Sequence, residues 1–487
     1  MFRPVYIVAF LVLWLSSCGP KPSIDPLTDT KSPADLQEDF DIFEGILRKA
    51  HPSIYSYAGP KRYMELFDSL RNTINYSTTQ RDFYNKLFTY TNEIGCAHTM
   101  VMLPRKAADT LYNRALFFPE PVVLIGDRLL VNSDEGLPHG TEILSVNGVS
   151  VKNILSRLAF YNAVDGRNPE AQRKMAAGDF GYEYYTWYGG STPFRVQIRD
   201  TLGRRKDTSL LPVNLEVLRA RENGAYYFDA VDVPYSLHLD EENRVAVLRL
   251  TTFHYESDNQ QNAYEDFLKN SFALLKRTPS IQSLVIDLRE NRGGYLYSSF
   301  LLLSYLAMNK FSEYGSVSTR IRDIPYRSYL SGDYSTDYIE QLNEKLEKDF
   351  RHEGLTNRYQ DSLIQVWTPQ PDHFSGRVFI VTNANVMSAA SGFAAMVQHS
   401  GRGQIIGVGT AGGSYSGNGF QTLEYVLPHT GMSFVFPYAK ITYPFTHTRQ
   451  ECGLIPDHIV PDNEEAFRKN RDAQLRYILD SLMKKNN

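Results

Sequence analysis

Cysteines, surplus basic residues and cofactor-binding motifs are all scarce in this sequence. Only 3 cysteines occur among 487 residues, which excludes a small fold held together by disulfides. The 51 Lys and Arg residues are balanced by 55 Asp and Glu residues, so we expect no nucleic-acid partner. His-Glu-x-x-His, Cys-x-x-Cys and P-loop strings are also missing. The sequence therefore predicts no cofactor, neither a metal nor a nucleotide.

The N-terminus carries the longest apolar run of the sequence, from Val5 to Leu15. As a helix, 11 residues would rise about 16 Å, which is too short for the roughly 30 Å hydrocarbon core of a membrane. The run therefore predicts a signal peptide over residues 1–17. Its ending, Leu-Ser-Ser-Cys, resembles the lipobox of bacterial lipoproteins, in which Cys18 becomes the lipidated first residue. An ordinary secretory signal with an incidental cysteine is the alternative.

The lipoprotein hypothesis places the mature chain in a bacterial cell envelope. Residues 18–33, rich in Pro, Ser, Asp and Lys, then form a lipidated tether. The protein would be a membrane-anchored lipoprotein that faces the periplasm or the exterior, with the membrane as a partner through the lipid.

Residues 34–105 are predicted to form an N-terminal helical cap. Apolar side chains recur at helical spacing in two stretches between residues 34 and 93. They are Leu36, Phe40, Phe43 and Leu47, and then Phe83, Leu87, Phe88 and Tyr90. A short strand, Met100 to Leu103, follows.

Residues 115–215 are predicted to form a strand-rich domain. The string Gly140 to Val149 contains an apolar strand that enters an Asn-Gly turn, and a helix from Val151 to Leu158 follows it. This arrangement, with a later strand from Phe194 to Ile198, resembles a PDZ domain. A clear carboxylate-binding loop is not visible in the sequence, so we leave the binding of peptide tails open.

Strands and helices alternate from residue 230 to residue 465, which predicts a parallel sheet with right-handed crossovers. The expected strands are Val245–Leu250, Ser283–Leu288, Val378–Thr382 and Gln404–Val408, and the expected helices are Gln261–Lys276, Ser298–Met308 and Ala389–Gln398. A polar, Tyr-rich insertion over residues 311–374, with a charged helix near Ile339 to Phe350, is expected to form a lid or rim. Residues 466–487 are expected to belong to a last amphipathic helix, which begins at Glu464.

Three strings on this background carry a family resemblance. They are Asp287-Leu-Arg-Glu-Asn-Arg-Gly-Gly294, Asn385-Val-Met-Ser-Ala-Ala390 and Gly453-Leu-Ile-Pro-Asp457. In this order they resemble the C-terminal processing (tail-specific) serine peptidases, in the branch of the tricorn core and the retinoid-binding protein of the eye. The resemblance implies an α/β fold with a ClpP/crotonase-like core, a helical cap and a PDZ-like domain. It also implies an endopeptidase that acts on polypeptides.

Ser388 is the predicted nucleophile. It follows a buried-looking strand and a turn, and it opens a helix, whose N-terminal N–H groups suit a developing oxyanion. The amides of Ala389 and of Gly293 or Gly294 are the predicted oxyanion donors. The alternative is that Ser388 only caps the helix.

The predicted base follows from the same resemblance. Bacterial tail-specific enzymes place a Lys at a fixed distance after the nucleophile, but Gly413 occupies that position here. The tricorn-like branch uses a His from the cap and a Glu before the Gly-x-x-Pro-Asp string, which correspond to His98 and Glu451. His98 would act as general base, so that activity declines below about pH 6 to 7. A structural histidine and a surface salt bridge are the alternatives for these two residues.

Two positions depart from the family pattern, and the family pattern does not include the pair of cysteines near the predicted base and Glu. Ser391 stands where the family often has Glu, and His399 stands where the Lys-type enzymes have Asp. A protein that keeps the fold and binds a peptide or another ligand without hydrolysis is therefore the alternative to an enzyme. If Glu451 pairs with His98, their neighbours Cys452 and Cys96 come close enough for a possible disulfide, with two separate buried thiols as the alternative.

Overall fold

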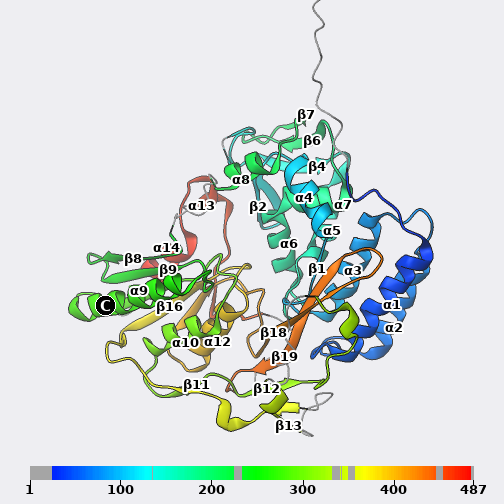
Figure 1. Cartoon of the computed structure of the whole chain (residues 1–487). Helices are drawn as coiled ribbons and strands as arrows, with labels where there is room; N and C mark the ends of the chain where they lie inside the picture. The colour runs from blue at the N-terminus through cyan, green and yellow to red at the C-terminus, as the bar shows by residue number, and fades with distance from the viewer. Residues whose placement is uncertain are drawn as a thin grey trace, which may run out of the picture.

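The computed structural model describes residues 25–133, 135–223, 233–331, 341, 343–348, 357–445 and 453–483. The predicted signal peptide, Cys18, Glu451 and Cys452 lie outside these ranges. Among the described helices, none is long and apolar enough to cross a membrane. Figure 1 shows the chain as a helical cap, a middle unit and a C-terminal core.

The cap contains three helices, α1 (Pro33–Ala50), α2 (Pro60–Asn72) and α3 (Gln80–Ile94), which confirm the predicted helical stretch. Ser32 accepts a hydrogen bond from the Asp35 N–H at the start of α1, and Thr79 forms a capping box at the start of α3. Gly95, at φ +64°, ends α3. This end directs the chain into the turn that carries His98.

The middle unit is an antiparallel sheet with the strand order β2-β3-β4-β6-β7, and β5 pairs with β4. Its strands are β2 (Val122–Ile125), β3 (Arg128–Val131), β4 (Glu142–Val146), β5 (Val149–Ser150), β6 (Phe194–Arg199) and β7 (Arg205–Leu210). Its helices are α5 (Val151–Leu158), α6 (Pro169–Gly178) and α7 (Phe180–Tyr188), with α4 (Arg105–Arg114) before and α8 (Leu215–Asn223) after the unit. The unit has its own core, in which Phe118, Ile154 and Phe194 are buried. The predicted strand, Asn-Gly turn and helix around residue 147 are confirmed.

The C-terminal core is a six-stranded sheet in the order β20-β17-β16-β10-β9-β8. The strands β9 (Val245–Leu250), β10 (Ser283–Asp287), β16 (Arg377–Thr382), β17 (Gln404–Gly407) and β20 (His458–Ile459) run parallel, and β8 (Tyr235–Asp240) pairs antiparallel at the edge. The crossover helices are α9 (Asp258–Arg277), α10 (Leu296–Ser304) and α12 (Ala389–His399). Side chains alternate between two hydrophobic clusters: Leu284 and Ile286 pack with the helices, whereas Val285 packs with Ile478 near the C-terminus. Both sheet faces are therefore buried, as expected for parallel strands.

A third sheet connects the cap to the core. The strand order is β1-β19-β12-β14-β13, and β18 pairs with β19. Its strands are β1 (Met100–Met102), β12 (Ser316–Thr319), β13 (Leu346–Lys348), β14 (Asn357–Tyr359), β18 (Ser416–Val426) and β19 (Ser433–Thr442). Figure 1 shows the β18–β19 hairpin between the cap helices and the core. Because Met100 pairs with Val435, the turn before β1 is brought to the core.

The insertion differs from its prediction. Residues 346–348, expected in a charged helix, form β13, because they pair with β14 and bury Leu346 at 5% exposure. Residues 341, 343 and 344 are helical, whereas Ile339 and Phe350 lie outside the described residues. A small ladder of β11 (Phe311–Ser312) and β15 (Val366–Trp367) flanks them, and short 3-10 turns occur at Ala159–Tyr161, Arg327–Tyr329 and Asp361–Leu363. The described part of the insertion therefore extends the third sheet.

The predicted continuous C-terminal helix is wrong. The chain forms α13 (Glu464–Arg468), α14 (Ala473–Tyr477) and a π-helical turn, Ile478–Met483. Asn470 has a left-handed φ of +46°, which interrupts a right-handed helix. The Asp472 side chain then caps α14 by accepting the Leu475 N–H at 2.8 Å, and it forms an ion pair with Arg289. The cap and the ion pair stabilise the break.

Candidate active site

Ser388 lies in a strained turn between β16 and α12. Its φ of +53° and ψ of −129° belong to a region that costs a non-glycine residue on the order of 1–3 kcal/mol. The Glu290 carboxylate holds this turn, because it accepts hydrogen bonds from Asn383 Nδ2 at 2.6 Å and from Asn385 Nδ2 at 2.7 Å. The Ser388 side chain makes no capping bond to α12, so the helix-cap alternative is wrong.

The Asp-Leu-Arg-x-Asn-x-Gly-Gly string forms the support under Ser388. Asn291 is fully buried; its side-chain oxygen accepts the Gly293 N–H at 2.9 Å, and its backbone oxygen accepts the Met387 N–H at 3.3 Å. A Cβ on Gly293 would lie only 2.6 Å from Ser388 Cβ. The glycine is therefore required for the close approach of the two backbones.

Two backbone N–H groups beside Ser388 have no hydrogen-bond partner among the described residues. They belong to Ala389, the first residue of α12, and to Gly294. The N–H of Gly293 is occupied by Asn291. Of the two glycines predicted as oxyanion donors, only Gly294 therefore has its N–H available. Gly293 instead packs closely against Ser388.

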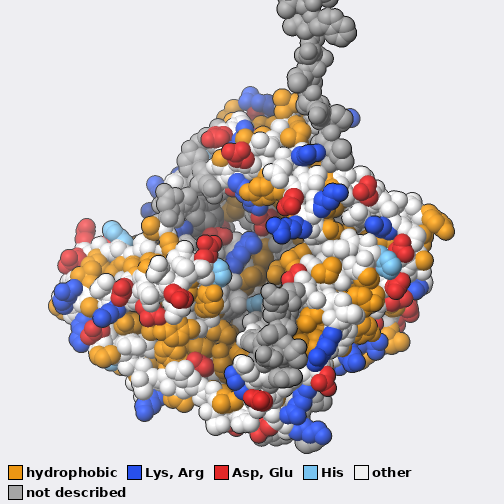
Figure 2. Space-filling model, viewed as in Figure 1, with side chains coloured by type: hydrophobic (Ala, Val, Ile, Leu, Met, Phe, Trp, Pro, Cys, Tyr) orange, Lys and Arg blue, Asp and Glu red, His pale blue; other side chains and the backbone are white. Residues whose placement is uncertain are grey.

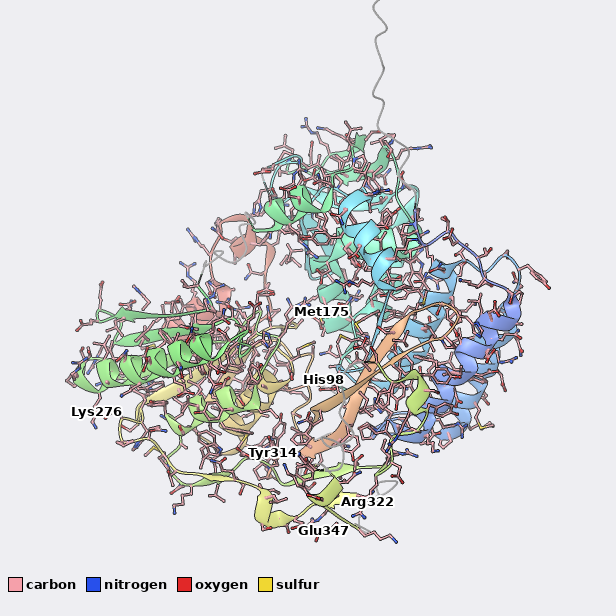
Figure 3. All side chains as sticks on the ribbon, in the orientation of Figure 1. His98, Met175, Lys276, Tyr314, Arg322 and Glu347 are labelled. Carbon is pink, nitrogen blue, oxygen red and sulfur yellow. The ribbon has the colours of Figure 1, made fainter. Side chains whose placement is uncertain are left out.

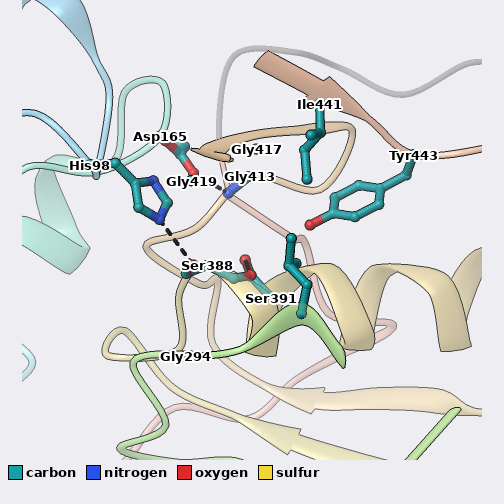
Figure 4. A pocket seen from close by; sticks show the side chains of 11 residues that line it. His98, Asp165, Gly294, Ser388, Ser391, Gly413, Gly417, Gly419, Ile441 and Tyr443 are labelled. Atoms are coloured by element: carbon teal, nitrogen blue, oxygen red, sulfur yellow. Dashed lines mark hydrogen bonds between the residues drawn. The ribbon is translucent and has the colours of Figure 1, made fainter. Parts of the chain in front are cut away.

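His98 meets Ser388 from the other side of the site. Its Nε2 lies 2.9 Å from Ser388 Oγ (Figure 4), although the two residues are 290 positions apart in the chain. Figure 3 labels His98 near the middle of the molecule. Burial lowers the pKa of His98 below its usual 6.5, and the charge of Asp165 opposes this shift. The imidazole is therefore neutral at pH 7 and able to accept a proton. A Cβ on Gly419 would lie 2.7 Å from this Nε2, so β18 packs directly against the ring.

The neighbouring Thr99 is also fixed. His51 is fully buried, accepts the Ser53 N–H through Nδ1 at 3.0 Å and bonds Thr99 Oγ1 through Nε2 at 2.8 Å. Burial lowers the pKa of His51 to about 3, so its imidazole stays neutral. This contact holds the chain one residue beyond His98.

Within the described part of the chain, Asp165 is the acidic residue at the site, and the sequence did not indicate it. It is 4% exposed and lies in the loop before α6. Its carboxylate accepts the backbone N–H groups of Ala97 and Gly413, each at 3.0 Å. An isolated Val-Asp-Gly string resembles any surface turn, so no local signal marked it.

A small cavity of about 20 Å³ opens beside Ser388, with space for about one water molecule. The residues lining it include Leu296, Ser391, Ile441 and Tyr443 (Figure 4). Ser391 donates a hydrogen bond to the Ser388 carbonyl at 2.9 Å. His399 stacks on Phe445, at 3.9 Å between ring centroids, away from this lining.

Donor atoms of Cys96, His98 and Asp165 lie within 4.8 Å of one another and form the group of described residues that could hold a metal ion. Lys440 is close enough for Asp165 and Cys96 to oppose the lowering of its pKa by burial. A nearby ammonium group disfavours a further cation there. Glu451 and Cys452 lie outside the described residues, so the Glu451 role and the Cys96–Cys452 disulfide stay predictions.

A family model matches the part of the chain that carries the site. The model of peptidase family S41 matches residues 244–460. Those residues belong to peptidase family S41. The matched segment, which is just under half of the chain, includes Ser388 and its supporting string, and the protein is a serine-type peptidase. No curated protein matches the chain significantly.

Solved structures extend the likeness beyond the S41 segment. Mature CPAF complexed with lactacystin is 15% identical, with a TM-score of 0.66, over 93% of this chain and 98% of that chain. A photosystem II D1 C-terminal processing protease is 13% identical, with a TM-score of 0.43, over 92% and 97% of the two chains. A putative peptidase from Parabacteroides merdae is 14% identical, with a TM-score of 0.46, over 93% and 97%. The CPAF likeness confirms a mixed α/β fold with a helical N-terminal region.

Proposed function

We propose that this S41 peptidase is an endopeptidase that cleaves polypeptides through an acyl-enzyme on Ser388, with His98 as general base. The observation that carries the proposal is the 2.9 Å contact between His98 Nε2 and Ser388 Oγ, beside the unoccupied amides of Gly294 and Ala389. This is the geometry that an activated serine and an oxyanion site require.

The groups act in sequence. His98 accepts the Ser388 proton while Oγ attacks the scissile carbonyl carbon, and the resulting oxyanion accepts hydrogen bonds from the two amides. His98 then donates the proton to the leaving amine, and the C–N bond breaks. Water, deprotonated by His98, hydrolyses the ester and restores Ser388. Glu451 is proposed, from the family resemblance, to orient the imidazole and stabilise its cation.

Polypeptide access fits the shape of the molecule. A hollow lies on the face between the middle unit and the C-terminal core (Figure 2). The sheet, Asn-Gly turn and helix of the middle unit support its assignment as a PDZ-like domain. A ClpP/crotonase-like core is supported by the parallel β9-β10-β16-β17 ladder.

The location of the enzyme is proposed from the sequence alone. Residues 1–17 act as a signal peptide, and Cys18 carries the lipid that holds the remaining 470 residues at a bacterial membrane. Mass spectrometry of the native protein tests this, since a mature mass without acyl groups would contradict it. Release of the native protein by high salt would do so as well.

A fluorophosphonate probe tests the catalytic proposal. We expect it to label the wild-type protein at Ser388 and to leave Ser388→Ala unlabelled. Ser391→Ala is the matched control, because Ser391 is three residues away and donates its hydroxyl to the Ser388 carbonyl. Failure of the folded wild-type protein to react with the probe and to cleave casein would favour a binding protein that keeps the peptidase fold.

A further inference from the structure

The loop before α6 contacts two other parts of the active site. The Asp165 N–H donates to the Ala411 oxygen at 2.8 Å, and the Gly166 N–H donates to the Gly95 oxygen at 2.9 Å. Asn168 Nδ2 donates to the Thr410 oxygen at 3.2 Å. The loop therefore binds both the turn that carries His98 and the loop that follows β17.

The Asp165 carboxylate contacts the same two parts of the chain. One carboxylate oxygen accepts the N–H of Ala97, the residue before the base, and the other accepts the N–H of Gly413. The adjoining Gly412 packs against the nucleophile, because a Cβ there would lie 2.8 Å from the Ser388 N. One carboxylate thus connects the backbone of the base to the loop beside the nucleophile.

The same carboxylate faces the His98 ring. A carboxylate oxygen of Asp165 lies within 4.8 Å of a ring nitrogen of His98 (Figure 4). The His98 Nδ1 atom is buried and has no hydrogen-bond partner among the described residues. Among these residues the Nδ1–H of a protonated imidazole would have no hydrogen-bond acceptor, and Asp165 is the nearby group whose charge favours protonation.

We infer that Asp165 is a positioning residue of this peptidase, which holds His98 against Ser388 and stabilises its imidazolium from the loop before α6. The inference rests on the proposed roles of Ser388 and His98. It assigns to the middle segment of the chain a part in catalysis, separate from the role predicted for Glu451.

Other ionisable groups near this pair are Cys96, Lys440 and Tyr443. Asp165 and Cys96 oppose the burial that lowers the pKa of Lys440, and Asp165 adds to the burial that raises the pKa of Tyr443. Tyr443 is therefore neutral at pH 7. Among the described residues, Asp165 is the carboxylate whose charge acts on His98.

The test is Asp165→Asn in the full chain, followed by the rate of fluorophosphonate labelling between pH 4.5 and 9. Loss of the charge removes the group that raises the pKa of His98. The acid limb, which is the low-pH fall of the labelling rate, should therefore move to lower pH by about 0.5–1 unit. The plateau rate should fall by about 100-fold or more, since the cation formed in the transition state loses its counter-charge. We therefore expect Asp165→Asn to have a lower plateau rate than the wild type, and to hold that plateau down to a lower pH.

Asp39→Asn is the matched control. Asp39 is also fully buried and accepts two backbone N–H groups, those of His429 at 3.1 Å and Thr430 at 2.8 Å, between the cap and the β18–β19 hairpin. Its loss should lower stability and leave the acid limb unchanged. Asp165→Glu, which retains the charge, should lower the rate and keep the acid limb near that of the wild type, and it serves if Asp165→Asn does not fold.

The outcomes separate the two proposals. An unlabelled wild-type protein would overturn the catalytic role of Ser388 itself. A labelled wild-type protein whose Asp165→Asn variant keeps the wild-type acid limb, and loses rate only in proportion to its folded fraction, would overturn the role of Asp165 alone. If Asp39→Asn shifts the acid limb as much as Asp165→Asn, the shift has a general structural origin and the inference is also overturned.

Discussion

The proposed nucleophile and the proposed base of this site are held in opposite ways. Ser388 is fixed within the C-terminal core, by Glu290 and Asn291 from one strand end and by the first turn of α12. His98 is fixed by three separate parts of the chain: the loop at Asp165, the buried His51 and the strand β18 at Gly419. The difference shows that the position of Ser388 depends on contacts within the C-terminal core, whereas the position of His98 depends on the assembly of the whole molecule.

Removing the nucleophile should give the largest effect. We expect Ser388→Ala to abolish labelling and peptide cleavage, a loss on the order of 10⁶-fold by analogy with other serine peptidases. The fold should persist, because the Ser388 side chain makes no capping bond to α12. Casein cleavage and circular dichroism check both parts, and persistent cleavage by the purified variant would contradict the assignment.

Gly293→Ala should break the nucleophile side while leaving the base in place. The new Cβ would meet Ser388 Cβ at 2.6 Å and the Met387 oxygen at 2.9 Å, at a residue with φ +94°. We expect a loss of activity of about 100-fold or more and a destabilisation of about 1–3 kcal/mol.

The control for that variant is Gly126→Ala. Gly126 also has a positive φ, +60°, but nothing lies within 4 Å of its added Cβ. It should show only the backbone strain, with full activity. The labelling rate measures the activity of both variants, and urea unfolding measures their stability. Equal losses of activity in the two variants would refute the close-approach argument.

Gly419→Ala should break the base side. Its Cβ would meet His98 Nε2 at 2.7 Å, and no positive φ adds backbone strain. Displacement of the ring should lower the labelling rate by about 10–100-fold with a small change in stability. Gly178→Ala, where nothing lies within 4 Å of the added Cβ, is the control and should be fully active. A fully active Gly419→Ala would show that the base tolerates movement.

A change of pH should give the smallest effect. It distinguishes His98, which should affect activity, from His51, which should affect stability. Because burial lowers the pKa of His98, activity should fall only as the pH drops below 6.5. The unfolded state protonates His51 below about pH 6.5 whereas the folded state resists until about pH 3. Stability should therefore fall across this window, with a contribution of up to about 1.4 kcal/mol per pH unit from His51.

His51→Gln should reduce that slope without moving the acid limb of activity, as checked by urea unfolding at several pH values. An unchanged slope would show that His51 is not the group that takes up the proton.

The sequence predicted the nucleophile side more fully than the base side for a physical reason. The strands of the core are continuous apolar runs buried on both faces, and the strings around Asn291 and Ser388 each follow one of these strands, β10 and β16. Asp165 was missed because its partners, Ala97 and Gly413, are 68 and 248 positions away. The charged segment at residues 346–348 was misassigned because strand pairing overrode its helical pattern.

The pairing of β1 with β19 also has a consequence for the order in which activity can arise. The strand that holds the turn of His98 in register, residues 433–442, follows Ser388 in the chain and is therefore synthesised after it. A nascent or truncated chain that ends before this strand contains both the serine and the histidine but lacks the ladder that brings them together. We therefore expect chains that end before residue 433 to be unable to cleave one another, because the proposed base would not be held against Ser388.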